Sequence, residues 1–308
     1  MLKNIPWPIS RQYRSGSDHE PLEFYLNGLS NSKELDLLLG YFSFSAINML
    51  SVGFARFLYN GGKLRVVANH VFSEEDRDAI VTAHEPERFK QDLINLGDLT
   101  NLEYTLDNYG RHFFNCMAWL IAHDRIELKI IKPKDKKGIA HYKSGVFRDG
   151  VNEVKFKASC NFTAYGLVEN LEEIDIDLGW EDQQSKSRLQ DQNEYFENIF
   201  NGKADFVEYL PAEKTVTAIK EKFGEKSIDE LLSAEAELGS LKNNLKQSPS
   251  IQRLLKRFQD ENLEIAQQPK FPFPGGPRDY QKEAIKEALL GALRNSILCF
   301  SRYGSNNS

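Results

Sequence analysis

The sequence predicts an α/β fold, in which a mixed β-sheet is flanked by helices and followed by a helical C-terminal extension. Three observations predict it. Apolar runs typical of buried strands alternate with helical patterns, a two-residue turn signal joins two later strands, and charged helical segments follow. With 308 residues, 41% of them hydrophobic, the chain is long enough to bury one large core or two modest ones.

A strand–helix–strand unit is expected near the N-terminus. Residues 35–42 form a continuous apolar run, as expected for a strand buried on both faces. Residues 45–60 carry apolar side chains at helical spacing and end at Gly61-Gly62, after which residues 63–69 again resemble a strand. This order is typical of a parallel sheet with helices packed on it.

Further elements of both kinds follow this unit. Helices are expected over 74–98, 110–123 and 186–201, and strands over 125–131, 139–148, 153–160 and 172–178. Asp149-Gly150 separates two of these strands and is a hairpin signal, so that pair should be antiparallel.

The character of the chain changes after Pro211. The segments that follow are charged, have a helical pattern and contain few apolar residues. Residues 268–277 contain four prolines and two glycines, which indicates a linker. We therefore expect a folded domain over 1–208, a helical extension over 209–267, and a linker with the start of a further segment over 268–308.

Cysteine usage and hydropathy indicate a cytoplasmic protein without membrane association. The three cysteines are widely separated and form no CxxC pair, which argues against a disulfide framework and against a zinc site. No apolar window is long enough to span a bilayer, and the N-terminus has no signal-peptide pattern.

The net charge of −6 hides strong local differences. Residues 125–148 contain eight Lys/Arg and two acidic residues, whereas residues 171–182 contain six acidic residues and no basic one. A second basic stretch, residues 241–257, has five Lys/Arg and no acid, and a solvated helix face explains it equally well.

The residues with the clearest chemical pattern are His141-Tyr142-Lys143 and a later polar stretch, residues 158–163. On a strand, the period of two places His141 and Lys143 on the same face. Asn161 and Ser159 follow the next strand and add an amide and a hydroxyl. An ammonium and an amide bind phosphoryl oxygens, while an imidazole attacks phosphorus or protonates the leaving oxygen, so this set suits a phosphodiester.

These residues resemble the motif of the phospholipase D superfamily, which is marked by HxK, an Asp, GSxN, and a later Asn and Glu. The chain has HYK at 141–143, ASCNFT at 158–163, and then Asn170 and Glu172. The resemblance covers the first domain. Two departures are Ala158 in place of the first Gly and Asp149, which lies one residue further from the Lys than the family's Asp and is equally explained as a turn residue.

The resemblance implies a role for each motif residue. His141 would form a phosphohistidine intermediate, Lys143 and Asn161 would bind the phosphoryl oxygens, and Glu172 would hold His141 in its reactive tautomer. Ser159 and Asn170 would support the phosphate site. No metal and no cofactor is implied. The alternative is a chance coincidence of a strand histidine, a surface lysine and an ordinary turn.

The superfamily's reaction uses two HxK motifs, and this chain has one. The resemblance therefore implies a homodimer with one composite site at its two-fold axis. DNA is the favoured substrate, since lipid enzymes of the superfamily usually carry both motifs in one chain. The candidate DNA-binding residues come from the basic stretch: Lys132, Lys134, Lys136, Lys137 and Arg148.

Residues 276–285 (GPRDYQKEAI) resemble the start of a superfamily-2 helicase core, in which the Gln, here Gln281, reads an adenine. No phosphate-binding loop follows, so we expect a truncated start of a helicase, and ATP would serve only that missing portion. The layout resembles restriction and anti-phage nuclease–helicase polypeptides, with the helicase in cis. An ordinary amphipathic helix over 278–293 is the alternative.

The favoured interpretation is thus a metal-independent DNA endonuclease module of a defence or restriction system. A phosphodiesterase acting on a lipid or a small diester is a second possibility. A third is a non-catalytic dimerising module that holds DNA for the helicase, in which case His141→Ala would leave the biological effect intact.

Overall fold

The computed structural model describes residues 1–39, 44–69, 108–134, 142–158, 173–223, 226–243 and 249–267. Two compact units divide the chain, Met1–Ala266 and Gln267–Ser308, and the first contains nearly all of the described residues. The helix expected over 74–98 and the linker and helicase-like segment after 268 lie outside the described residues.

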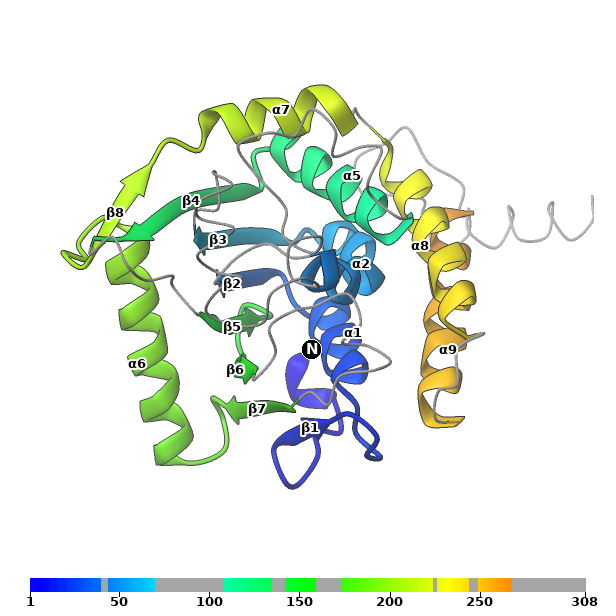
Figure 1. Ribbon diagram of the computed structural model, residues 1–308. Helices are drawn as coiled ribbons and strands as arrows, with labels where there is room; N and C mark the ends of the chain where they lie inside the picture. The colour runs from blue at the N-terminus through cyan, green and yellow to red at the C-terminus, as the bar shows by residue number, and fades with distance from the viewer. Residues whose placement is uncertain are drawn as a thin grey trace, which may run out of the picture. The chain divides into compact units, whose positions relative to one another are not determined.

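The first unit is an α/β structure built on one mixed sheet (Figure 1). The sheet that the described residues form has eight strands in the order β1-β7-β6-β5-β2-β3-β4-β8. Only the neighbours β2–β3 and β3–β4 run parallel, and the other pairs are antiparallel. The strands are β1 (Gln12–Arg14), β2 (Glu34–Leu39), β3 (Lys63–Asn69), β4 (Ile126–Pro133), β5 (Lys143–Arg148), β6 (Glu153–Ala158), β7 (Glu173–Leu178) and β8 (Val207–Leu210).

Helices cover both faces of the sheet. In Figure 1, α6 lies on one side of the strands, while α1, α2 and α5 lie on the other side with α7, α8 and α9 outside them. The helices are α1 (Pro21–Asn31), α2 (Phe44–Tyr59), α5 (Asn108–Ala122), α6 (Gln183–Phe200), α7 (Glu213–Phe223), α8 (Ile228–Asn243) and α9 (Pro249–Ala266), and a short 3-10 helix spans Leu2–Asn4.

The central strand β2 shows why the sheet is buried on both faces. Leu35, Leu37 and Leu39 enter the large core beneath α1, α2 and α5, while Leu38 packs in a second cluster beneath α6. Burial of these side chains on both faces is the expected property of a continuous apolar strand. The predicted strand is confirmed over Glu34–Leu39, and residues 40–42 of the prediction lie outside the described residues.

The main core is aromatic where α1 crosses the antiparallel strands. Phe24 of α1 contacts the rings of Phe147 on β5 and Phe156 on β6, with centroids 5.7 and 5.2 Å apart. Gly145 of β5 leaves the space that the Phe156 ring occupies, because a Cβ built there would lie 2.6 Å from that ring. Tight packing of this kind fixes the register of β5 against β6.

A polar contact joins the C-terminal helices to the rest of the unit. Helix α2 is interrupted at Val52 and Gly53, where the φ of Gly53 is +107°, so the N–H of Ala55 lacks its ordinary partner within the helix. The buried Glu235 of α8 accepts a hydrogen bond from this N–H at 2.6 Å, and Asn262 of α9 donates to the same carboxylate at 2.9 Å. The extension is therefore docked on α2.

Because these helices are docked on α2, the compact unit extends beyond the expected domain boundary at 208. β8 spans that position and pairs with β4, and α7 and α8 bury Ile219, Phe223, Leu231 and Leu232 in the main core. The unit ends at Ala266, beside the expected linker. None of the helices in the described part of the chain combines the length and the apolar character needed to cross a bilayer.

Candidate active site

The strands that carry the predicted motif meet at one end of the sheet. β5 starts at Lys143, β6 ends at Ala158, and β7 starts at Glu173. The three strands are adjacent and antiparallel, and Ser144 of β5 lies opposite Lys157 of β6. These three chain ends therefore lie side by side, and we call this end of the sheet the motif end.

The other predicted catalytic residues are close to the motif end in the sequence. His141 precedes Lys143 by two residues, Ser159 directly follows Ala158, Asn161 comes three residues after Ala158, and Glu172 directly precedes Glu173. They lie outside the described residues, as do Asn170, Lys136 and Lys137. The described structure thus brings together the three strand ends that these residues precede or follow in the sequence, because β6 pairs with both β5 and β7.

Lys143 is the one predicted catalytic residue that the structure describes. It starts β5 opposite Leu39, the last residue of β2, and it is partly buried. Its neighbour Ser144 accepts a hydrogen bond from Gln192 of α6 at 3.2 Å. Because successive side chains alternate between faces, Lys143 lies on the face of the sheet opposite α6.

Tyr142, which separates His141 from Lys143, lies on the α6 face. Its hydroxyl is 2.7 Å from that of Tyr195 in α6, and the two rings meet edge to face. Burial, together with the hydrogen bond to Tyr195, raises the pKa of Tyr142 above its ordinary value, so its hydroxyl stays protonated at neutral pH. The HxK pattern assigns no role to Tyr142, although its place between His141 and Lys143 is a signal in the sequence.

Asp149 does not lie at the motif end. It follows the opposite end of β5, about 20 Å from Lys143 at 3.4 Å per residue. Its carboxylate accepts hydrogen bonds from the backbone N–H groups of Leu2, Val151 and Asn152 at 2.7–3.0 Å. Burial alone would raise its pKa, but these hydrogen bonds outweigh it and lower the pKa. Asp149 is a turn residue that holds the hairpin and the N-terminus.

Arg148 also lies away from the motif end. It lies at the far end of β5, where its guanidinium pairs with the buried carboxylate of Asp36 and with Glu153. It also donates to Asn193 of α6 at 2.7 Å. A guanidinium that is 15% exposed and already holds three partners is structural, so its proposed contact with DNA is not supported.

Lys132 and Lys134 lie at the same end of the sheet as the motif, where β4 ends. The Lys132 ammonium forms an exposed ion pair with Glu208 at 3.0 Å. The Lys134 ammonium donates to the backbone carbonyl of Asp205 at 3.0 Å. A carbonyl carries no charge, so this contact does not neutralise the ammonium. Both positions suit phosphate binding near the motif end.

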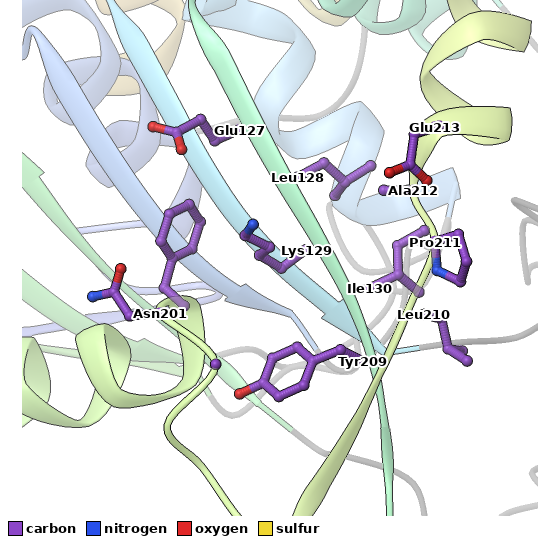
Figure 2. Close-up of a pocket in the computed structure, with 12 residues that line it drawn as sticks. Glu127, Leu128, Lys129, Ile130, Asn201, Tyr209, Leu210, Pro211, Ala212 and Glu213 are labelled. Atoms are coloured by element: carbon purple, nitrogen blue, oxygen red, sulfur yellow. The ribbon is translucent and has the colours of Figure 1, made fainter.

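A cavity of about 470 Å³ lies elsewhere, where β8 diverges from β4 (Figure 2). Glu127 and Lys129 of β4, Asn201 after α6, and Tyr209 of β8 are among the residues that line it. The Tyr209 hydroxyl donates to the carbonyl of Ile199 at 2.7 Å, and the Lys129 ammonium lies over the Phe200 ring. Lys143, the predicted catalytic residue that the structure describes, is not among the residues that line this cavity.

Two further observations bear on the site's identity. Within the ranges that the structure describes, no three His, Cys, Asp or Glu side chains gather as metal ligands. Neither the known protein-family models nor the curated proteins include one that matches this chain. The functional assignment therefore depends on the motif and on the arrangement of its strands.

Proposed function

We propose that this chain is a metal-independent phosphodiesterase that cleaves DNA through a phosphohistidine intermediate at His141. The observation that carries the proposal is the convergence of the β5, β6 and β7 ends, from which the predicted catalytic residues start. The motif spans 32 residues of sequence, from His141 to Glu172, and its residues can act at one phosphate only if these strand ends converge. Residues that match the motif by chance would not require the strand ends to converge.

In the proposed reaction, one imidazole nitrogen of His141 attacks phosphorus, the N–P bond forms, and the P–O bond to the leaving strand breaks. His141 of the partner subunit gives its proton to the leaving oxygen. A water molecule then attacks the phosphohistidine and gives a proton back to the partner's histidine, and the N–P bond breaks. Lys143 and Asn161 bind the non-bridging oxygens, Ser159 and Asn170 support the phosphate, and Glu172 orients His141.

The proposal is tested by incubating plasmid and single-stranded DNA with the purified chain in excess EDTA. We expect cleavage that persists in EDTA and is lost in the His141→Ala chain. Cleavage that requires Mg²⁺, or that both chains perform equally in EDTA, would contradict the proposed chemistry. A lipid or small-diester substrate would be indicated by hydrolysis of such a diester without cleavage of DNA.

The composite site makes a quantitative prediction for mixed dimers. If each site needs His141 from two chains, native chains that pair with His141→Ala chains are inactive. After subunit exchange at equal concentrations, activity per native chain should fall to about half, because random pairing leaves half of the native chains with a native partner. Cleavage rates at a series of mixing ratios measure this. Activity that stays proportional to the native chain alone would show a site complete within one chain.

We further propose that this module serves a nuclease–helicase of a restriction or anti-phage system. The support is the helicase-like segment at residues 276–285, which lies outside the described residues. DNA cleavage that becomes dependent on ATP when a helicase is supplied in cis would support the proposal. A parent gene that encodes no helicase motifs after this segment would contradict it.

A further inference from the structure

Two exposed aromatic rings lie next to each other on the α6 side of the motif end. Tyr195 of α6 is 38% exposed and Phe206, just before β8, is 46% exposed. Their rings are nearly parallel, with an interplanar angle of 12° and centroids 6.2 Å apart. Tyr142 supports the pair from the sheet through its hydroxyl contact with Tyr195. We call Tyr142, Tyr195 and Phe206 the aromatic platform.

The platform is held in place by its surroundings. Tyr195 precedes the buried Phe196, which fixes this turn of α6 on the sheet. The backbone carbonyl of Phe206 accepts from the N–H of Lys134 at 3.0 Å, and the next residue, Val207, is buried in β8. Two exposed rings that are fixed in this way offer a rigid apolar surface at little entropic cost.

The charges around the platform favour a single strand over a duplex. Lys134 and Lys132 lie beside it, but Glu208 pairs with Lys132, and Asp205 and Glu194 are exposed nearby in the sequence. Duplex binding depends on neutralising many phosphates, and this mixed surface is poorly suited to that. Aromatic rings bind bases by stacking, and only unpaired bases present free faces.

The platform is connected to the proposed site through β5. Tyr142 lies between His141 and Lys143 in the chain, and Lys134 follows the end of β4 at the same end of the sheet. A strand whose bases stack on Tyr195 and Phe206 lies on the α6 face at the motif end, and its phosphates reach Lys143, on the opposite face, by passing over the start of β5. We propose that the aromatic platform binds unpaired bases and thereby directs single-stranded DNA to the site; the second part of this inference rests on the proposed function.

The test measures binding of the full chain, in EDTA, to a fluorescently labelled oligothymidine by anisotropy. Tyr195→Ala and Phe206→Ala should each weaken binding about tenfold, as expected for the loss of one stacked base. Phe206→Leu, which keeps an apolar side chain without an aromatic face, should weaken it similarly. Tyr195→Phe keeps the ring and should bind within about twofold of the native chain.

Three controls separate stacking from other causes. Tyr59→Ala removes a ring that is 45% exposed on α2, on the other face of the sheet, and should leave binding unchanged. An abasic oligonucleotide should bind weakly and equally to all the chains, because it has phosphates but no bases. A duplex of the same length should also bind the variants and the native chain equally. Circular dichroism and thermal unfolding confirm that each variant is folded.

The outcomes for the platform and for the nuclease are distinguishable. Oligothymidine binding that the alanine variants retain, or equal affinity of the native chain for the abasic probe, would overturn the platform while leaving DNA cleavage untouched. Loss of binding in the variants, with no chain cleaving DNA, would support the platform and contradict the nuclease. If light scattering shows instead that the variants lose a dimer without losing oligothymidine affinity, the platform is a contact between two copies and our inference is wrong.

Discussion

The His141→Ala chain is expected to cleave DNA at least about 10⁴-fold more slowly than the native chain. Loss of the nucleophile removes the covalent intermediate, and loss of the same residue from the partner subunit removes the general acid. Removing a nucleophile alone costs rates of this order in other hydrolases. Initial rates of plasmid nicking in EDTA measure the effect, at protein concentrations that keep both chains in the same oligomeric state.

A second histidine provides the matched control. His123 is exposed and lies at the C-terminal end of α5, just before β4 begins and therefore at the end of the sheet opposite the motif. His123→Ala should retain the native rate. A residual rate in His141→Ala within tenfold of the native rate would rule out His141 as the nucleophile. Trapping an acid-labile, alkali-stable label from a substrate radiolabelled at the scissile phosphate would detect the phosphohistidine directly.

Long periodic segments of this fold were predictable from the sequence. β2, α2 and β3 form the expected strand–helix–strand unit, and Asp149-Gly150 makes the expected hairpin between β5 and β6. The N-terminal elements β1 and α1 and the strand β8 were not predicted. β1 and β8 have three and four residues, too few for a reliable period, and they depend on pairing with β7 and β4.

Contacts between residues that are distant in sequence limit how much of the site can be predicted from the sequence. The HxK spacing is local, so the motif can be recognised in the sequence, and the adjacency of β5 and β6 follows from the hairpin signal at Asp149-Gly150. Arg148 looked like part of a basic run because its main partner, Asp36, precedes it by 112 residues. The aromatic platform was missed for the same reason, since Tyr142 and Tyr195 are 53 residues apart. Charge and aromatic content alone do not reveal which side chains are already paired.

Replacement of Asp36 is expected to cause a large loss of stability. This carboxylate is 3% exposed on the α6 face of β2, and it accepts from the Arg65 guanidinium of β3 through both oxygens at 2.7 Å. Arg148 of β5 pairs with it from the other side. Asp36→Ala would leave two partly buried guanidinium groups without their shared carboxylate, which should lower the free energy of unfolding by about 3 kcal/mol.

Glu197 supplies the matched control for this prediction, because it pairs with the same Arg65 at 2.8 Å but is 44% exposed. Glu197→Ala should cost less than about 1 kcal/mol, as solvent screens an exposed pair. Equilibrium urea unfolding of both variants, followed by circular dichroism, gives the two values. Equal losses would mean that burial of Asp36 does not decide its contribution. A large loss for Asp36 alone would show that one carboxylate aligns β2, β3 and β5, the strands that lead to the motif end.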